Sequence, residues 1–192
     1  MDATITARLA TIDDANAISS LILRALQEVN IKDYGPALIA EQSKNWTVGG
    51  VAAKMQNRIT YIASDGGDIV GTAAFDGQQA RTVFVKPDRH KLGVGSLLMR
   101  TVEMPASEPG LDRLSLQSSI TAQGFYRRLG YSPVRDVFHG AERTILDGKA
   151  TRKGGSLRGI PTPTASRFGL PLHQLARVNL SKYRQLSRDR KD

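Results

Sequence analysis

The sequence predicts a mixed α/β domain of about 150 residues, followed by a short basic tail. Strand-like and helix-like segments alternate through the first 150 residues, apolar residues make up 40% of the chain, and the excess positive charge follows residue 150. The predicted order is strand, helices, three strands, helix, strand, helix and two strands, which is typical of an α/β domain. We therefore expect one domain in residues 1–150 and a linker with a partly helical tail in residues 151–192.

The composition excludes several classes of protein. No apolar run approaches the ~18–20 residues of a membrane-spanning helix, so we expect no membrane association. The first residues lack the basic-then-apolar order of a secretory signal. The chain has no cysteine, which excludes disulfides, thiol catalysis and cysteine-ligated zinc, and its three histidines lack metal-ligand spacing. We expect a cytoplasmic protein without a metal.

The net charge of +9 is unevenly distributed. Residues 1–150 hold 17 Lys and Arg against 16 Asp and Glu, a net charge of +1, whereas residues 151–192 hold 10 against 2, a net charge of +8. The folded domain is thus nearly neutral. Only the tail has the charge to bind nucleic acid, and a solvated extension is the simpler interpretation of it.

The first third of the chain predicts a short strand and then helices. Residues 4–8 are strand-like, and apolar residues recur at helical spacing over 13–29. Thr11 with Asp14 three residues later resembles a capping box, which marks the start of a helix. Gly35-Pro36 begins a short helical segment, because proline suits a first helical turn. A further helix is predicted from residue 48 to about residue 57.

The rest of the domain predicts strands separated by turns and two helices. Strands are expected at 59–63, 69–75 and 82–85, with Asp- and Gly-rich turns between them. A helix follows at 94–104, where Pro105 ends it, and a strand at 114–116. Residues 119–129 predict a helix closed by Gly130, since glycine suits the left-handed position after a helix. Two strands, near 132–138 and 142–147, complete the domain.

The segment from Val83 to Met99 is the most informative one. It reads as an apolar strand, a basic loop, Gly93-Val94-Gly95 and a helix. A helix N-terminus presents unpaired N–H groups and partial positive charge, so it can bind phosphate. A tight turn before a helix is the alternative interpretation. A Walker loop is excluded because no Gly-Lys-Ser/Thr follows, and a Rossmann fingerprint because its third glycine is replaced by Leu98.

These residues resemble the signature of the GNAT N-acetyltransferase superfamily. The family has a strand ending in Val-x-Pro and then Gln/Arg-x-x-Gly-x-Gly/Ala, and this chain has Val85-Lys86-Pro87 and His90-Lys91-Leu92-Gly93-Val94-Gly95. His90 departs from the usual Gln or Arg. A second family signature is matched by Ser119-Ile120-Thr121-Ala122, Phe125-Tyr126 and Gly130-Tyr131. The resemblance covers roughly residues 4–148.

The resemblance implies a GNAT fold, with a mixed, mostly antiparallel sheet flanked by helices, and acetyl transfer from acetyl-CoA to a primary amine by direct attack. It implies that the strand carrying Phe84 and Val85 splays away from the strand at 112–117. The Val85 N–H would stabilise charge on the thioester oxygen, and Tyr126 would act as the general acid. The implied acetyl-CoA-binding residues are Phe84, Val85, His90, Lys91, Leu92, Gly93, Val94, Gly95, Ser96, Ser119, Phe125 and Tyr126.

The general base is not defined by the sequence. Many family members carry a glutamate on the strand before the phosphate loop, but residues 78–83 contain no carboxylate. Asp76 is the nearest acid and is better explained as a turn residue beside a glycine. His139 and an ordered water are further alternatives. Trp46 and Tyr34 either line the acceptor site or belong to the core.

Two functions from different classes remain open. The first is an acetyl-CoA-dependent N-acetyltransferase whose acceptor is a small-molecule amine or a peptide amine. The second is a non-catalytic GNAT-fold module that binds CoA or a partner, with a tail that binds polyanions. A homodimer formed through an edge strand also remains open.

Overall fold

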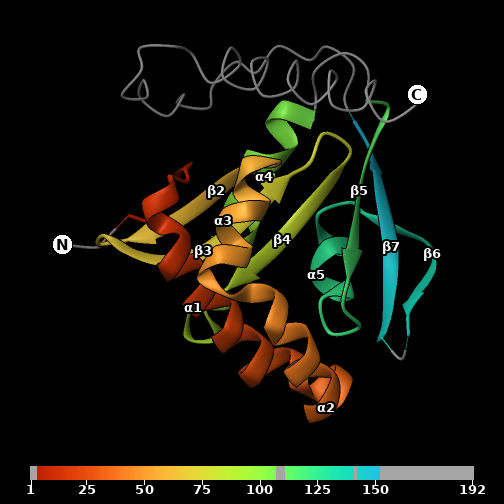
Figure 1. Ribbon diagram of the computed structural model, residues 1–192. Helices are drawn as coiled ribbons and strands as arrows, with labels where there is room; N and C mark the ends of the chain where they lie inside the picture. The colour runs from red at the N-terminus through yellow and green to blue at the C-terminus, as the bar shows by residue number, and fades with distance from the viewer. Residues whose placement is uncertain (1–3, 107–110, 141, 152–192) are drawn as a thin grey trace, which may run out of the picture.

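The computed structural model describes residues 4–106, 111–140 and 142–151. Seven strands form one sheet in the order β1-β2-β3-β4-β5-β7-β6 (Figure 1). Every neighbouring pair is antiparallel except β4 and β5, which are parallel. The strands are β1 (Thr6–Leu9), β2 (Ile59–Asp65), β3 (Asp68–Phe75), β4 (Gln79–Val85), β5 (Arg113–Ser118), β6 (Ser132–His139) and β7 (Glu142–Ala150).

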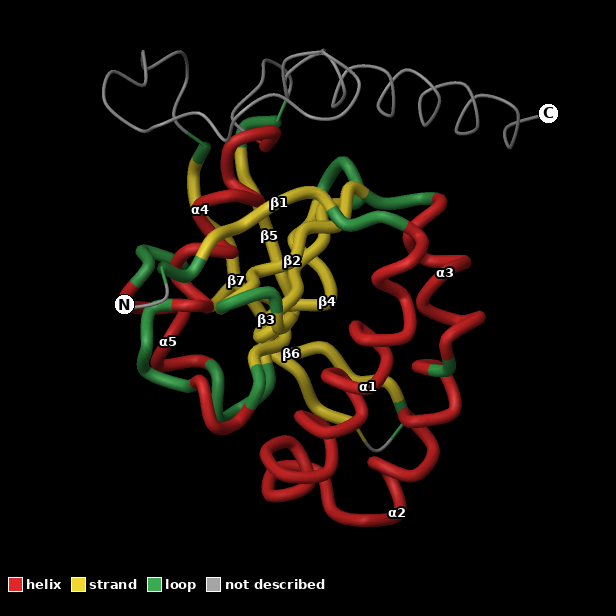
Figure 2. Tube along the Cα trace, turned by 90° about the vertical axis from the view of Figure 1, so that its left-hand side faces the viewer, coloured by secondary structure: helices red, strands yellow, loops and turns green. Residues whose placement is uncertain are grey.

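Two helical layers cover the sheet. Figure 2 shows α1, α2 and α3 on one face and α4 and α5 on the other. The helices are α1 (Ala15–Ala25), α2 (Ile31–Ser43), α3 (Val48–Gln56), α4 (Val94–Ala106) and α5 (Gln123–Arg128). None of the helices in the described ranges is both long and apolar enough to cross a membrane. The mixed α/β architecture predicted from the sequence is confirmed.

Each face of the sheet has its own apolar core. Ile18 and Ile22 of α1 pack with Ile62 of β2 on one face, while Leu98 and Val102 of α4 belong to the core of the other. All five side chains are at most 1% exposed. Burying one such side chain stabilises the fold by about 1.5–3 kcal/mol. The helical periodicity of the sequence therefore marks the faces that hold the layers together.

The order of elements agrees with the prediction, but several boundaries differ. The helix predicted over 13–29 is α1, which continues through a π-helical turn at Leu26–Asn30 directly into α2. Gly35 interrupts α2 with a φ of 76°, just before Pro36. β4 begins at Gln79 rather than 82, and α4 extends one residue past Pro105.

The predicted start of α5 also differs from the structure. This helix begins at Gln123, not at 119, because Ser119 holds a preceding turn: its carbonyl and hydroxyl both accept from the Ala122 N–H, at 3.2 and 3.3 Å. Gly130 follows the helix with a φ of 86°, as predicted. The basic extension predicted for residues 151–192 lies outside the described residues from Arg152 onward.

The start of α1 depends on Asp14. Its carboxylate accepts the Thr11 backbone N–H at 2.7 Å and the Thr11 hydroxyl at 3.2 Å, which supports the predicted capping arrangement. Two nitrogens of Arg8 also donate to it, each at 2.8 Å. One acidic side chain thus joins β1 to the first helical layer.

The sheet opens between β4 and β5. Only Gln79 with Ser115 and Ala80 with Leu116 are paired across this seam. Beyond them β4 carries a bulge: the register with β3 shifts between Thr72 and Ala74, and Thr82 adopts a φ of 53° that a β-branched residue rarely takes. The bulge turns the C-terminal half of β4 away from β5, so the expected splay is present.

Candidate functional site

The exposed edge of β4 beside the splay carries Val85. The Lys86 N–H donates to the Val70 carbonyl at 2.9 Å, which makes residues 86 and 70 a hydrogen-bonded antiparallel pair. Hydrogen-bonded and non-hydrogen-bonded pairs alternate along such a ladder, and Val85 lies opposite Gly71 in the next pair. The Val85 N–H and carbonyl therefore face away from β3, toward the open side of the seam.

The loop that leads from β4 into α4 presents a row of backbone donors. Lys91 and Gly93 adopt φ values of 63° and 83°, and the first bond of α4 runs from the Leu97 N–H to the Gly93 carbonyl at 2.9 Å. In the described part of the chain, the N–H groups of residues 91–96 donate to no protein acceptor. Free backbone donors at a helix N-terminus, together with the helix dipole, are an arrangement that can bind an anion such as a phosphate group.

The side chains of this loop are less available than the sequence indicates. Lys86 binds Asp68 at 2.6 Å, and Arg89 lies 3.5 Å from Asp65. An anion at this loop would therefore meet mainly backbone donors, since these cations already have carboxylate partners. Of the cationic residues between β4 and α4, Lys91 keeps an exposed side chain.

His90 lies at the strand edge. Its Nε2 is 3.2 Å from the Val85 carbonyl oxygen, so the ring contacts the backbone group that would otherwise be open to a ligand. The sequence gives His90 a place in the loop but does not show this contact. A ligand that pairs with the Val85 carbonyl must displace the ring.

The two glycines of the loop have different roles. A Cβ on Gly93 would meet nothing within 4 Å, but the positive φ there favours glycine. A Cβ on Gly95 would lie 3.0 Å from Cζ of Phe125. Gly95 therefore lets the Phe125 ring of α5 pack against the first turn of α4. Gly93 is thus favoured by its backbone conformation and Gly95 by the close packing of Phe125.

Tyr126 lies beside Phe125 in an aromatic cluster. Its ring centroid is 5.0 Å from that of Phe125 and 5.9 Å from that of Tyr131, and the residue is 5% exposed. Burial raises the pKa of Tyr126 above its ordinary value, and the charge of Asp147 adds to the rise. The hydroxyl is therefore protonated at neutral pH, which is the form that can donate a hydrogen bond.

A buried carboxylate lies near this cluster. Asp147 of β7 is fully buried, its Oδ2 accepts the Ser118 hydroxyl at 2.5 Å, and its Oδ1 has no hydrogen-bond partner. Buried carboxylates without full pairing are rare and costly. Sequence reasoning missed Asp147, because an Asp in a strand ordinarily marks an exposed position.

The structure assigns the candidate bases to different surroundings. Asp76 accepts two backbone N–H groups, at 2.7 and 3.0 Å, and Arg81 Nε at 2.7 Å. Burial alone would raise the pKa of Asp76, but these donors outweigh it and hold the pKa below its ordinary value. His139 contacts the Gln117 side chain, with its Nε2 3.1 Å from Oε1. Asp76 is thus a turn residue and a poor base.

Two further polar side-chain atoms, one on Gln79 and one on Tyr34, are buried without a hydrogen-bond partner. The Gln79 side-chain oxygen is buried without a hydrogen-bond partner, at the first pair of the seam. The Tyr34 hydroxyl is also buried without one, and burial, followed by the charges of Glu142 and Asp33, raises its pKa. Asp33 accepts the Thr121 N–H at 3.1 Å and also its hydroxyl, which ties α2 to the segment before α5.

Trp46 links the first helical layer to β4. Its ring meets that of Phe84 edge to face at a centroid distance of 5.8 Å, and both pack against the core of α1 and α3. Core packing and lining of a site are both compatible with this position. No group of three or more His, Cys, Asp or Glu among residues 4–106, 111–140 and 142–151 could hold a metal ion.

Comparison with known proteins agrees with this geometry. The profile of the acetyltransferase (GNAT) domain family matches residues 56–133, the segment from the end of α3 to the start of β6. A search of curated proteins finds no match. The sequence resemblance to this family is thereby confirmed for the segment that holds β2 to α5.

Solved structures with a similar fold include a GCN5-related N-acetyltransferase from Rhodopseudomonas palustris, with a TM-score of 0.68 and 23% identity over 78% of this chain and 98% of that one. PaiA N-acetyltransferase from Thermoplasma acidophilum, in complex with coenzyme A, has a TM-score of 0.65 and 14% identity over 77% and 99%. The ribosomal-protein-S18-alanine N-acetyltransferase from Escherichia coli has a TM-score of 0.59 and 17% identity over 82% and 100%.

Proposed function

We propose that this protein is an N-acetyltransferase that moves an acetyl group from acetyl-CoA to a primary amine. Its fold is that of solved GNAT acetyltransferases, and its residues 56–133 match the acetyltransferase (GNAT) domain family. The observation that carries the proposal is the row of free N–H donors at residues 91–96 beside the splayed edge of β4. A diphosphate fits the donors, and an extended amide-bearing arm fits the edge. The coenzyme A complex of the Thermoplasma relative supports the same choice of ligand.

The chain's own residues divide the work in this proposal. The N–H groups of residues 91–96 bind the diphosphate of acetyl-CoA, which supplies a reactive acetyl thioester when bound. Ser96, in the first turn of α4, adds a hydroxyl nearby. Val85 offers its backbone groups at the strand edge with Phe84 beside it, while Phe125 packs against the first turn of α4. The Val85 N–H is aimed into the seam, where it stabilises negative charge that develops on the thioester oxygen.

Tyr126 acts on the leaving group. Its protonated hydroxyl donates a hydrogen bond to the departing thiolate, whose parent thiol has a pKa of about 8.5 by analogy with cysteine. Because the pKa of Tyr126 is raised, the hydroxyl stabilises the thiolate as a donor rather than losing its proton beforehand. Direct attack by the amine requires no covalent intermediate on the enzyme, in agreement with a chain that has no cysteine.

A non-catalytic CoA-binding module is the second candidate. His90 on the Val85 carbonyl and a neutral amide, Gln79, near the expected place of a carboxylate favour it. Release of free CoA in the presence of a panel of primary amines separates the two. Acetyl-CoA binding with CoA release supports the enzyme, binding without release supports the module, and no heat on titrating acetyl-CoA into the folded protein contradicts both.

A further inference from the structure

The first turn of α4 and the start of α5 meet where Gly95 contacts the ring of Phe125. A Cβ on Gly95 would lie 3.0 Å from Cζ of Phe125, 3.3 Å from Cε2 and 3.7 Å from Cε1. The three nearest heavy atoms beyond the glycine's own neighbours in the helix thus all belong to this ring. The position where a side chain would begin at residue 95 therefore faces Phe125.

The backbone at Gly95 does not itself require glycine. Gly93 has a positive φ of 83°, but Gly95 is not among the described glycines with a positive φ and lies inside α4. Alanine fits a helical backbone and is a better helix former than glycine. The requirement for glycine at residue 95 therefore comes from the Phe125 ring, whereas at residue 93 it comes from the main chain.

Phe125 is one of two rings that enclose Tyr126. The ring centroids of Phe125 and Tyr126 are 5.0 Å apart at an interplanar angle of 63°, and those of Tyr126 and Tyr131 are 5.9 Å apart at 71°. Edge-to-face contacts of this kind favour one orientation of each ring relative to its neighbour. Tyr126 is only 5% exposed, so its ring has little space to turn independently. A displacement of Phe125 should therefore displace the Tyr126 ring as well.

The first turn of α4 lies at both ends of the proposed chemistry. Its N–H groups belong to the row of free donors at residues 91–96, and Gly95 in the same turn is the surface on which Phe125 packs. Catalytic groups must be held to a fraction of an ångström, because a misplacement of about 1 Å can reduce a rate ~100-fold. A turn that contacts both the donor and the support of the acid can set the distance between them.

We propose that Gly95 is a positioning residue for Tyr126: by leaving room for the Phe125 ring, it sets the place of the acid relative to the turn that binds the diphosphate. The proposal rests on the proposed acetyltransferase function, because Tyr126 acts on the leaving group only in that reaction. It differs from a role in which the glycine makes room for the ligand. Loss of Gly95 then lowers kcat, whereas loss of a ligand contact lowers acetyl-CoA affinity.

Gly95→Ala tests this assignment. The added methyl group must push the Phe125 ring away by a few tenths of an ångström, so kcat should fall about three- to tenfold. The Kd for acetyl-CoA, measured by calorimetry, should change by less than about twofold, because the N–H of residue 95 is retained. An unchanged kcat overturns the proposal, and so does a weakened acetyl-CoA affinity with kcat unchanged.

Gly49→Ala is the matched control. Gly49 is the second residue of α3 as Gly95 is of α4, and a Cβ on Gly49 would meet nothing within 4 Å. The control therefore repeats the change in helix propensity without a new contact. It should keep kcat and raise the melting temperature by up to about 4 °C. A fall in kcat as large as that of Gly95→Ala contradicts the proposal.

A second variant shows whether Gly95 acts through Phe125. Phe125→Leu removes the three ring atoms that the new Cβ would meet, since leucine has no Cε or Cζ. Phe125→Leu alone should lower kcat, because Tyr126 loses an edge-to-face contact. Adding Gly95→Ala to Phe125→Leu should then lower kcat by less than about twofold more. Effects that simply multiply in the double variant overturn the proposal.

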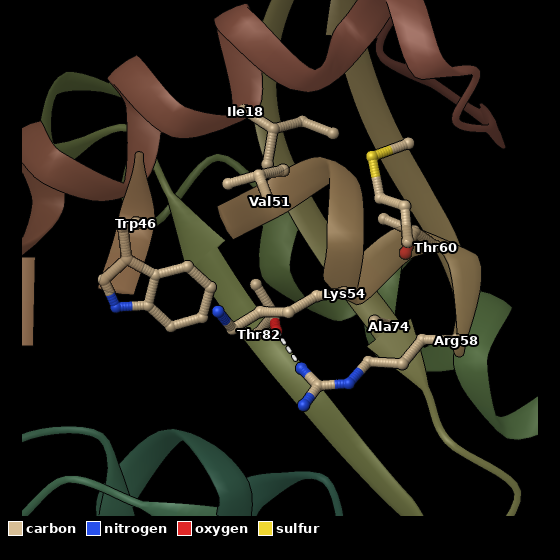
Figure 3. A pocket seen from close by; sticks show the side chains of 9 residues that line it. Ile18, Trp46, Val51, Lys54, Arg58, Thr60, Ala74 and Thr82 are labelled. Atoms are coloured by element: carbon tan, nitrogen blue, oxygen red, sulfur yellow. Dashed lines mark hydrogen bonds between the residues drawn. The ribbon is translucent and has the colours of Figure 1, made fainter. Parts of the chain in front are cut away.

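A measurement that needs no turnover separates this inference from the proposed function. The chain has five tyrosines, and in protein with isotope-labelled tyrosine rings the magnetic resonance signal of Tyr126 is the one lost in Tyr126→Phe. Gly95→Ala should shift this signal in the ligand-free full chain, and Gly49→Ala should not. The fluorescence of Trp46, the only tryptophan, reports on the opposite face of the sheet (Figure 3) and should be unchanged in Gly95→Ala.

The two measurements together give distinct outcomes. A shifted Tyr126 signal in Gly95→Ala without any acetyl transfer by the unaltered protein supports the contact through Phe125 and contradicts the proposed function. Acetyl transfer with an unchanged kcat in Gly95→Ala contradicts the positioning role and leaves the enzyme standing. An unshifted Tyr126 signal overturns the proposal whether or not the protein transfers acetyl groups.

Discussion

At the scale of single residues, the site depends on groups whose ordinary chemistry is altered by their surroundings. Burial raises the pKa of Tyr126 further above neutrality, and the donors around Asp76 lower the pKa of its carboxylate. The two residues were both candidates for proton chemistry in the sequence. Their environments give them different roles. The buried phenol of Tyr126 can donate a hydrogen bond, whereas the Asp76 carboxylate already accepts three hydrogen bonds and is a poor base.

Tyr126→Phe tests the donor role. Removal of the hydroxyl should lower kcat by about 10²- to 10⁴-fold, the usual range for a positioned acid, and leave acetyl-CoA affinity nearly unchanged. Steady-state kinetics and calorimetry measure the two quantities. Tyr131→Phe is the control, because Tyr131 packs against Tyr126 and donates to Glu103 at 3.1 Å instead. A kcat unaltered across the pH range in Tyr126→Phe removes this tyrosine from the mechanism.

Asp76→Asn tests the assignment of the nearest acid. The substitution weakens the charged bonds to Arg81 and to two backbone N–H groups, so it should destabilise the fold by about 1–3 kcal/mol. The kcat of the folded variant should keep its pH profile. Denaturant unfolding gives the stability, and a pH series of initial rates gives the profile. Loss of the acidic limb of that profile would restore Asp76 as the base.

The limits of sequence reasoning are clearest at this scale. Tyr126 and Gly93 could be found from spacing, since each belongs to a local motif. Asp147 and the contact of His90 with the Val85 carbonyl could not, because they depend on which strands pair and how the loop folds back. Arg58 precedes β2 and Thr82 lies in β4, so their hydrogen bond at 3.1 Å depends on how the strands fold together and could not be found from the sequence.

At the scale of elements, the sequence pattern predicts the order of the strands and main helices in the described domain, and approximate bounds for most of them. The errors occur where local hydrogen bonds override periodicity. Ser119 delays the start of α5, and the Asp76 carboxylate organises the turn that begins β4 three residues early. The seam between β4 and β5 cannot be read from either strand alone, since it results from the bulge at Thr82.

The loop before α4 offers a test at this scale. Gly93→Ala places a Cβ in open space but at a φ of 83°, so it should cost about 1–2 kcal/mol in stability and reorient the N–H groups that follow. Acetyl-CoA affinity should then fall about tenfold or more in calorimetry. Gly66→Ala has a comparable positive φ in the β2–β3 turn and no clash, so it should lose similar stability and keep its affinity.

The start of α1 gives a pH-dependent prediction. The Arg8 guanidinium is the main cause of the lowered pKa of Asp14, and it outweighs the opposing effect of burial. A carboxylate with a lowered pKa in the folded state stabilises the fold above its unfolded pKa of 3.8, and that stability is lost as the pH falls through its folded pKa. Asp14→Asn should cost about 0.5–2 kcal/mol at pH 7, and the difference from the unaltered protein should shrink below pH 3.8.

At the scale of the whole molecule, the net charge is concentrated in the last 42 residues of the sequence. Residues 1–150 are nearly neutral and residues 151–192 carry a net charge of +8. Thr151 donates its N–H to the Asp112 carbonyl at 3.0 Å and its hydroxyl to Leu111, so it still belongs to the end of the β5–β7 pair. The domain boundary predicted at residue 150 remains a prediction, and this contact places the best point for truncation after Thr151.

A chain of residues 1–151 should fold and bind acetyl-CoA as the full chain does. Thermal unfolding and calorimetry compare the two. Binding of DNA or RNA, with an affinity that falls steeply as salt is raised, should be confined to the full chain if it occurs at all, since the tail holds the excess charge. Loss of acetyl-CoA binding in the shorter chain would show instead that the tail contributes to the site.

The short pairing between β4 and β5, only two residue pairs long, has a consequence for local opening of the sheet. The two parts of the sheet, β1 to β4 and β5 to β7, are joined only by the pairs Gln79–Ser115 and Ala80–Leu116. A ligand bound between β4 and β5 should therefore hold the two parts together. Amide hydrogens along the second half of β4 should exchange quickly with heavy water in the ligand-free protein and slowly once a ligand is bound between β4 and β5. Ligand binding should also raise the melting temperature, so the weakest junction of the sheet is the one whose stability responds most to the ligand.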